Sequence, residues 1–443
     1  MFSPSRDADP SQDPEAPPSD LSLDARLAAG LSEIDAAGLR RSLRTVASAQ
    51  GPRIELGGRR VLNFSSNDYL GLAGDPAMVE AACRAARDFG TGTGASRLLS
   101  GTQSLHAELE ETLAGFKDTG AALAFSCGYA TALGVIPSLV AKGDVVIIDK
   151  LAHACLVDGA RLSGADLRVF PHNDTDRLDS HLRWARERSA GCRVLVVTES
   201  VFSMDGDLAP LAEIVELKDR HGAWLLLDEA HGTGVIGPGG RGLAHATGLH
   251  QLVDVHMGTL GKALGSAGGY IAGSRTLVDH LVNRARSFIF STAPPAAQAA
   301  AATAAIRWIQ TPDGLARIAS LDRLRAALAA ALPDKLAGPP PAAIVPVMVG
   351  GEADAVALAA ACLASGAWIP AVRYPTVPKG KARLRITLTA THSMEDVDSV
   401  ACLLRNVAAR KEESRSAKSP ARFLREKISA RRGSGQPAPR GVS

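Results

Sequence analysis

The sequence has few aromatic residues and no long apolar run. Only 4% of the 443 residues are aromatic, while alanine, glycine and arginine are abundant. Nothing reaches the roughly 18 consecutive apolar residues that a membrane span needs, so we expect no membrane association. Residues 1–20 carry acids and prolines without an apolar stretch, which is unlike a secretory signal. These absences predict a cytoplasmic protein.

Cysteine is scarce and shows no ordered spacing. The six cysteines are Cys83, Cys127, Cys155, Cys192, Cys362 and Cys402. No Cys-x-x-Cys pair or Cys/His cluster with zinc spacing occurs, so no metal site is predicted. We expect buried free thiols in a reducing compartment.

Net positive charge is also absent from most of the chain. The formal net charge is +3, yet residues 411–443 hold nine Lys/Arg and three Glu, so the remainder carries −3. Such a body lacks the basic surface of a nucleic-acid-binding protein, and we expect no nucleic-acid partner. Residues 1–20 and 411–443 are predicted to be disordered ends.

Short apolar runs alternate with helical stretches from about residue 120. The runs are Ala122–Phe125, Val145–Ile148, Leu167–Phe170, Val194–Val197, Trp224–Leu227, Val253–Met257 and Tyr270–Ala272. Strands that are apolar throughout are buried on both faces, which predicts an α/β fold with a mostly parallel sheet sandwiched by helices. We expect an N-terminal helix and hairpin at 21–64, a large α/β domain at 65–295 and a smaller C-terminal α+β domain at 296–410.

Polar residues cluster directly after four of these runs. The clusters are Ser126–Tyr129, Glu199–Ser203, Asp228–His231 and Thr259–Lys262. Ligands of open α/β sheets bind beyond the carboxyl ends of the strands. We therefore expect the four clusters to face one site.

Asp228 and Lys262 carry the most specific chemistry. Asp228 closes an apolar run, where a carboxylate is costly unless it is paired, and a protonated pyridine nitrogen would pair it. Lys262 has small glycines at positions 261 and 265 and could form a Schiff base with an aldehyde. His231 could hydrogen-bond to a ring oxygen. The set predicts pyridoxal 5′-phosphate (PLP) chemistry.

Other positions are weaker signals. The turn at Gly128 and Tyr129 begins a predicted helix, whose free N–H groups could bind a phosphate, and Thr259 could add a hydroxyl. His153 follows another strand and could stack on a ring. A lone histidine is more often structural.

The Asp228-Glu-Ala-His231 string has a second interpretation, as the Walker B motif of a helicase-like NTPase. That function needs a Gly-x-x-x-x-Gly-Lys-Ser/Thr loop upstream. The only similar piece, Gly261-Lys262-Ala263, lies downstream and lacks the hydroxyl residue. An NTPase is therefore disfavoured. The glycine-dense stretch at 90–97 has alanine at position 95, which argues against a dinucleotide site.

Longer segments make the chain resemble the α-oxoamine synthase family of fold type I PLP enzymes. These segments are Asn63–Leu72, Ser96–Gly101, Glu199–Asp207, Asp228–Gly237, Gly258–Gly265 and Pro375–Arg385. They span roughly residues 38–405. The resemblance implies the fold type I PLP-transferase architecture and a homodimer with shared active sites.

The resemblance also implies cofactor contacts. Lys262 would bind PLP covalently and remove the α-proton of the substrate, with Asp228 paired to the pyridinium nitrogen. Ser203 and His231 would contact the ring oxygen, and His153 would stack on the ring. The residues that resemble phosphate contacts are Gly128, Tyr129 and Thr259, with Ser291 and Thr292 reaching the phosphate of the partner subunit.

Substrate contacts are implied in the same way. Arg385 resembles the arginine that binds the amino-acid carboxylate, a task suited to a bidentate guanidinium. Asn67 matches an active-site asparagine near the substrate, and Ser96 matches the smaller residue of members that accept alanine. Arg40 and Thr376 match positions that contact the acyl substrate, although the stretch around Arg40 is longer than usual.

The implied reaction is the decarboxylative condensation of L-alanine with a pimeloyl thioester, carried by CoA or by acyl-carrier protein. Its products would be 8-amino-7-oxononanoate, CO2 and a free thiol, in biotin biosynthesis. The residues after His231 and the Pro375-Thr376-Val-Pro segment favour this reaction. A 5-aminolevulinate synthase, a 2-amino-3-ketobutyrate CoA ligase or an acyl synthase of secondary metabolism are the alternatives within the family.

Overall fold

The computed structural model describes residues 22–188, 191–332 and 340–417, with side chains up to residue 406. The chain divides into two compact units at Thr45 and Val46. The first contains helix α1 (Leu23–Ala36), which begins where the Ser22 side chain accepts a hydrogen bond from the Ala25 N–H. This confirms the predicted N-terminal helix. The expected disorder of residues 1–20 lies outside the described residues.

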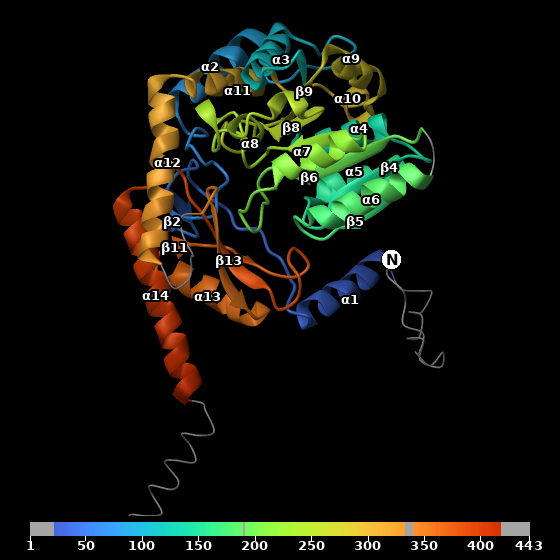
Figure 1. Cartoon of the computed structure of the whole chain (residues 1–443). Coiled ribbons are helices and arrows are strands. Elements are labelled where there is room, and N and C mark those ends of the chain that lie inside the picture. Colours follow the sequence, from blue (N-terminus) through green and yellow to red (C-terminus); the bar gives the residue numbers. More distant parts are fainter. Residues whose placement is uncertain (1–21, 189–190, 333–339, 418–443) are drawn as a thin grey trace, which may run out of the picture. The chain divides into compact units, whose positions relative to one another are not determined.

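The second unit is built on a seven-stranded sheet (Figure 1) with the strand order β3-β9-β8-β7-β6-β4-β5. Its strands are β3 (Ala121–Phe125), β4 (Val145–Asp149), β5 (Asp166–Phe170), β6 (Val194–Glu199), β7 (Trp224–Asp228), β8 (Val255–Thr259) and β9 (Gly269–Gly273). Only β9 runs antiparallel to its neighbours. Every predicted apolar run is a strand, and the mostly parallel sheet is confirmed.

Helices cover both faces of this sheet. Alternate strand residues face opposite ways, so Leu195 and Val197 pack in one apolar core while Val194 and Val196 pack in another. The helices that contribute to the first core are α4 (Gly128–Leu139), α5 (Ala154–Ser163), α9 (Arg275–Arg284) and α10 (Arg286–Ile289). Those on the other face are α6 (Thr175–Arg188), α7 (Leu211–Arg220) and α8 (Leu243–Ala246), with the 3-10 turns η1 (Pro238–Gly240) and η2 (His250–Leu252) nearby in sequence.

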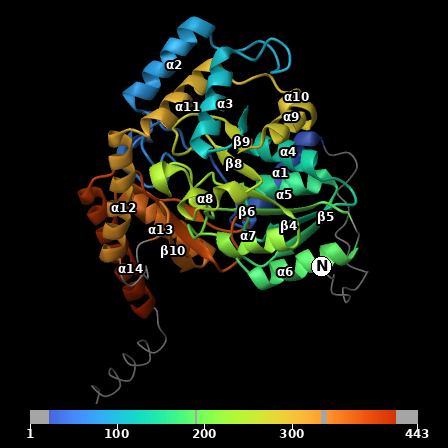
Figure 2. The same ribbon diagram turned by 45° about the horizontal axis from the view of Figure 1, so that its top comes forward.

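Three helices pack together beside β3 and β9. They are α2 (Pro76–Phe89), α3 (Ser104–Lys117) and α11 (Ala296–Trp308). Figure 2 shows α2 lying along α11, with α3 on the same side. Asp75 accepts from the Ala77 N–H and precedes Pro76, so α2 has the N-cap that the sequence predicts.

The C-terminal part has its own sheet, with the order β10-β13-β12. Its elements are α12 (Pro312–Ala331), β10 (Ile344–Gly350), α13 (Glu352–Ala364), β11 (Ala367–Trp368), β12 (Ala371–Val372), β13 (Ala382–Thr387) and α14 (Met394–Ala417). Helices α12 and α14 lie side by side in both views. The predicted hairpin is confirmed as β1 (Arg53–Leu56) and β2 (Arg59–Asn63), and β11 pairs in parallel with β2.

Two expectations differ from the structure. Helix α14 continues to Ala417, past residue 411 where the disordered tail was expected to begin, because Lys, Glu, Arg and Ala there favour helix. Residues 418–443 lie outside the described part. All six cysteines are free as expected, but only Cys155 and Cys362 are buried. Cys83 and Cys402 lie on outward helix faces, Cys127 is the N-cap of α4 and Cys192 lies in a loop.

Two kinds of feature are absent from the described residues. No helix among them is long and apolar enough to cross a membrane. No group of three or more His, Cys, Asp or Glu side chains in the same ranges could hold a metal ion.

Candidate active site

The four polar clusters lie at the carboxyl edge of the large sheet, which is the side where its parallel strands end. They follow the carboxyl ends of β3, β6, β7 and β8. Strand β3 runs in the same direction as β8, because both are antiparallel to β9, and β6 and β7 are parallel to β8. The sheet therefore brings the clusters to the same edge, as predicted.

Two carboxylates lie side by side at this edge. Asp228 ends β7 and pairs in register with Glu199, the last residue of β6, and both are buried. The Ala230 N–H donates to Asp228 Oδ1 at 2.9 Å, and the His153 N–H donates to Glu199 Oε1 at 2.5 Å. Burial raises the pKa of both carboxyls, and the charge of Lys262 opposes that rise. The pair provides a site for a buried cation or for a protonated ring nitrogen.

Lys262 lies in the turn between β8 and β9. Burial lowers the pKa of its amine, while the negative charges of Asp228 and Glu199 oppose the change. Gly265, three residues later, has φ of +61°, and a Cβ there would lie 2.4 Å from the Ala73 nitrogen. The turn therefore requires glycine at this position. A lysine with a lowered pKa is a competent nucleophile and base.

His231 and Tyr69 form a buried pair. The Tyr69 hydroxyl lies 2.5 Å from His231 Nδ1. Burial lowers the pKa of His231 well below its usual value, aided by the charges of Lys262 and Arg385, and burial raises the pKa of Tyr69 to about 12. The Tyr69 hydroxyl also lies 3.3 Å from Asn67 Oδ1, and when it donates to Nδ1 the proton of the neutral imidazole is on Nε2. His231 can therefore donate a hydrogen bond from Nε2.

A phosphate-sized cradle lies at the start of α4. Among the described residues, Thr259 Oγ1 is buried without a hydrogen-bond partner. A Cβ on Gly128 would lie 2.5 Å from Thr259 Cγ2, and one on Gly269 would lie 2.7 Å from the Gly128 nitrogen. The Tyr129 hydroxyl donates to Asp158, so only its backbone is available to a ligand. These groups fit an anion at the N-terminus of a 12-residue helix.

His153 is the N-cap of α5. Its Nδ1 accepts a hydrogen bond from the Cys155 N–H at 3.3 Å. Burial lowers the pKa of His153, and the charge of Asp228 opposes the effect. The structure thus places a largely neutral imidazole beside the carboxylate pair.

Arg385 brings β13 to the same edge. Its Nε donates to the Ser203 carbonyl at 2.7 Å, Nη1 to Thr387 Oγ1 at 2.9 Å and Nη2 to Asn67 Oδ1 at 3.3 Å. The residue is only 6% exposed, and no carboxylate of the described ranges forms an ion pair with it. A buried guanidinium with neutral partners alone is an anion site. Arg385, Ser203 and Asn67 are thus brought together.

Ser96 and Thr292 form an isolated antiparallel bridge. The Ala293 N–H donates to the Ala95 carbonyl at 3.0 Å, and Thr93 Oγ1 donates to the Ala293 carbonyl at 2.8 Å. Ser291, next along the chain, is half-buried. The loop before α3 and the loop before α11 therefore lie side by side.

Two predicted residues belong to other segments, Thr376 to a loop and Arg40 to the first unit. Thr376 is exposed in the loop between β12 and β13, where its N–H donates to the Arg373 carbonyl at 3.0 Å. Arg40 belongs to the first unit, where it forms an ion pair with Asp35 at 3.4 Å.

A buried ion pair supports the turn that carries Asp228 and His231. Lys117 Nζ lies 2.8 Å from Glu229 Oε2 and also donates to the Arg241 carbonyl at 2.6 Å. Both charged side chains are fully buried. Burial alone would raise the pKa of Glu229, but Lys117 and His256 together outweigh it and hold that pKa well below its usual range. The turn is therefore fixed on the side away from Lys262.

Sequence reasoning assigned no role to Glu199 or Tyr69, although both lie in segments that carry the family resemblance. A signal existed for Glu199, because it ends the apolar run 194–198 as Asp228 ends the next. Tyr69 gave no such signal, since its partner His231 lies 162 residues away.

Comparison with known proteins identifies the family. The model of the aminotransferase class I and II family matches residues 59–403. The 8-amino-7-oxononanoate synthase of Geobacter metallireducens is 49% identical over 378 residues, covering 84% of this chain and 95% of the relative. That of Geobacter sulfurreducens is 49% identical, covering 86% and 97%.

Solved structures agree with this result. Serine palmitoyltransferase from S. paucimobilis has a TM-score of 0.81 and 30% identity, and covers 88% of this chain and 99% of its own. The enzyme from Sphingomonas wittichii has the same TM-score and coverage with 32% identity. These matches confirm the fold type I architecture. The chain belongs to the aminotransferase class I and II family, and within it to the PLP-dependent α-oxoamine synthases that its motifs resemble.

Proposed function

We propose that this chain is a PLP-dependent acyltransferase that condenses L-alanine with a pimeloyl thioester. The products are 8-amino-7-oxononanoate, CO2 and the free thiol, a reaction of biotin biosynthesis. The observation that carries the proposal is the buried Arg385 guanidinium, which has no carboxylate partner among the described residues and lies at the edge that holds Asp228 and Lys262. An amino-acid carboxylate would supply that partner. Identity of 45–49% to curated oxononanoate synthases supports the choice of member.

The residues fit PLP at each of its polar groups. Asp228 would keep a proton on the ring nitrogen, and the Nε2–H of His231 and the hydroxyl of Ser203 would bind the ring oxygen. The phosphate would take the free Thr259 hydroxyl and the first N–H groups of α4 at Gly128 and Tyr129. When bound, PLP supplies the electron sink for negative charge at the α-carbon of the amino acid.

The chain itself positions the amino acid and moves the proton. Arg385 would bind the substrate carboxylate, with Asn67 beside it, until that group leaves as CO2. The amine of Lys262 would take the α-proton and later return one to the product, which its lowered pKa favours at neutral pH. His153 would cover one face of the cofactor ring and exclude water.

The acyl substrate and a second subunit complete the proposed site. Arg40 and Thr376 would contact the acyl chain, and Ser96 would leave room for the methyl group of alanine. Ser291 and Thr292 would reach the phosphate of the partner subunit in a homodimer. Three apolar side chains near these residues support a dimer, because they are exposed and a partner subunit would bury them. Leu98, Leu99 and Phe290 are 51%, 79% and 70% exposed.

A substrate matrix tests the function. CO2 release is measured with alanine, glycine and serine against pimeloyl-CoA, pimeloyl-acyl-carrier protein, succinyl-CoA and palmitoyl-CoA. Alanine with one of the pimeloyl donors should have the highest kcat/KM, and the better donor identifies the carrier. Glycine with succinyl-CoA, or serine with palmitoyl-CoA, as the best pair would overturn the proposal.

Colour provides an independent test of the cofactor. The purified protein should absorb in the near-visible range, and Lys262→Ala should remove the band that depends on covalent attachment. Lys142→Ala is the matched control, because Lys142 is an exposed lysine in the loop before β4, at the opposite edge of the sheet.

A further inference from the structure

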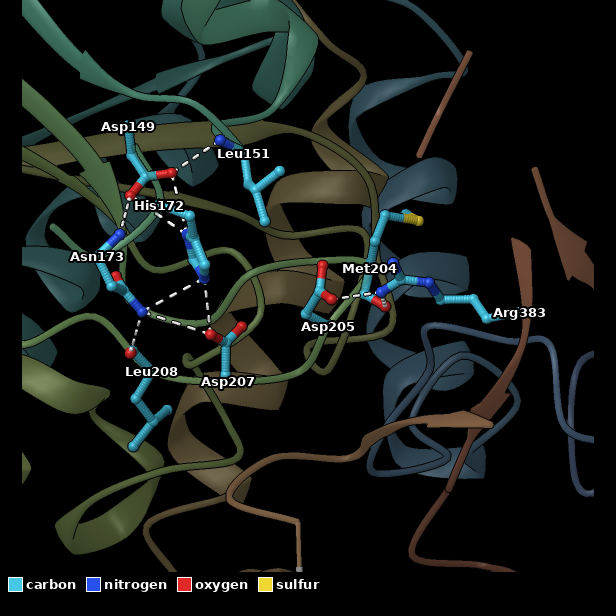
Figure 3. Close-up of polar contacts among 9 residues, drawn as sticks. All are labelled: Asp149, Leu151, His172, Asn173, Met204, Asp205, Asp207, Leu208 and Arg383. Carbon is cyan, nitrogen blue, oxygen red and sulfur yellow. Dashed lines mark hydrogen bonds and ion pairs between the residues drawn. The ribbon is translucent and has the colours of Figure 1, made fainter. Parts of the chain in front are cut away.

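His172 lies between two carboxylates just after β5 (Figure 3). Its Nδ1 is 3.1 Å from Asp149 Oδ1, and its Nε2 is 2.7 Å from Asp207 Oδ2. Asp149 is buried at the carboxyl end of β4, whereas Asp207 belongs to the loop between β6 and α7. The next residue adds to the connection, because Asn173 Nδ2 donates to the Leu208 carbonyl at 3.0 Å. His172 therefore ties this loop to the sheet.

The charge of His172 strengthens the tie. Burial works to lower the pKa of the imidazole, but the hydrogen bonds and negative charges of Asp149 and Asp207 outweigh it and raise the pKa to about 10. At neutral pH both ring nitrogens are therefore donors, and each has a carboxylate to accept. The ring of Phe202 packs edge-on against the imidazole, with centroids 4.3 Å apart. His172 thus contacts the loop at two points, on either side of Ser203.

The same loop is held from its other side by β13. Arg385 Nε donates to the Ser203 carbonyl at 2.7 Å. Arg383 Nη1 donates to the Met204 carbonyl at 3.3 Å and forms an ion pair with Asp205. Figure 3 shows the loop passing between the His172 group and Arg383. The carbonyl that orients Arg385 therefore belongs to a loop that His172 contacts through Phe202 and Asp207, and which also has hydrogen bonds of its own between Phe202, Gly206 and Asp207.

We propose that His172 is a positioning residue for the amino-acid substrate, because it holds through Phe202 and Asp207 the loop whose Ser203 carbonyl orients Arg385. The inference rests on the proposed role of Arg385 as the carboxylate-binding residue. Loss of the imidazole releases one side of the loop, so the guanidinium loses its fixed direction. Neither Ser203 nor Arg385 is among the residues proposed above to contact the acyl chain. Binding of the amino acid therefore depends on His172, and binding of the acyl donor does not.

Two variants and one control test this role. His172→Ala removes both donors, whereas His172→Gln retains an amide that can donate to one carboxylate. His221→Ala is the control, since His221 Nε2 also contacts an aspartate, Asp179 at 2.8 Å, but caps α7 at the opposite edge of the sheet. Hydrogen exchange is followed on the purified enzyme without substrate, and KM is measured for both substrates.

We expect amides 202–206 to exchange at least tenfold faster in His172→Ala, with β4 and β6 unchanged. The KM of the amino acid should rise about tenfold and that of the acyl donor less than twofold, with His172→Gln intermediate and His221→Ala like wild type. Unchanged exchange in the loop, or an equal rise in both KM values, would overturn the proposal. Faster exchange with a rise in the KM of an amino acid other than alanine would sustain the role of His172 and refute the assigned substrate.

Discussion

Arg385, the proposed carboxylate-binding residue, is held by three neutral groups of the chain. A guanidinium has five N–H donors, and the three hydrogen bonds to Ser203, Thr387 and Asn67 use one on each nitrogen. One N–H remains on each of Nη1 and Nη2, which is the pair that a carboxylate accepts in bidentate fashion. The orientation is fixed before the substrate arrives, so little entropy is lost on binding.

Arg385→Lys should therefore impair amino-acid binding selectively. Lysine keeps the charge but cannot hold Ser203, Thr387 and the substrate together. Losing the second hydrogen bond of the bidentate pair costs about 1.5–3 kcal/mol, and the amino-acid KM should rise roughly 12- to 140-fold in steady-state assays. Arg59→Lys, an exposed arginine of the hairpin, should leave both KM values unchanged. An equal response of the two variants would refute this role.

At the scale of elements, the turn after β7 at the carboxyl edge of the sheet is held in place by a buried ion pair. The turn after β7 presents Asp228 and His231 to the site, while Glu229 between them points to Lys117. A buried ion pair is worth little net stability against apolar replacements, but breaking one partner leaves an uncompensated charge. The Lys117–Glu229 pair therefore specifies one conformation of the turn.

Removing one partner of this pair should be costly and dependent on pH. Lys117→Met removes the lysine charge from buried Glu229 and leaves His256 Nδ1, at 3.6 Å, as the nearest other titratable group, at a cost of about 3–5 kcal/mol at neutral pH. The folded pKa of Glu229 is depressed, so the pair contributes fully above the usual carboxyl pKa of about 4.3 and loses its contribution as pH falls further. In the variant the carboxyl can be protonated at mild acidity. Its melting temperature should therefore lie several degrees below wild type at pH 7.5 and closer to it at pH 5.

The double variant Lys117→Met/Glu229→Gln is the matched control. With no charge left, most of the melting temperature should return. A double variant as unstable as the single one, or a loss that is the same at both pH values, would show that packing rather than charge causes the effect.

Features that depend on neighbouring residues in the chain could be predicted from the sequence, whereas contacts between segments far apart in the chain could not. The apolar runs predict strands because both faces of each are buried, and Asp228 and Lys262 predict PLP because each has a local signature. Tyr69 and His172 gave no signal, since their role depends on partners that the fold supplies. Arg385 could be assigned only by resemblance, because its contact with Ser203 joins residues 182 positions apart.

At the scale of the whole molecule, two joined loops of the second unit have exposed apolar side chains in or beside them. Leu98, Leu99 and Phe290 lie in or beside the loops joined by the Ser96–Thr292 bridge and are all more than half exposed. The same loops carry residues proposed to reach a partner's phosphate. Dimerisation and catalysis are thus proposed to depend on the same segments.

Leu99→Glu should separate the proposed dimer and remove activity together. A charge buried in an apolar interface lacks a partner, so the species in solution should fall from about twice 45.9 kDa toward that mass in sedimentation experiments. Leu315→Glu, on the exposed face of α12 at 46% exposure, should remain dimeric and active. A wild-type enzyme that is fully active as a monomer would refute the shared site.

The pairing of β2 with β11 has a consequence for biosynthesis. Leu62 lies opposite Ala367, so the third strand of this small sheet is synthesised long after the first two. At 5–20 residues per second, a ribosome needs roughly 15 to 60 s to cover that interval. Throughout that time β2 has an unpaired edge, which can pair with other chains. The Arg53–Asn63 hairpin is therefore the part of the nascent protein exposed to mispairing until its own partner strand emerges.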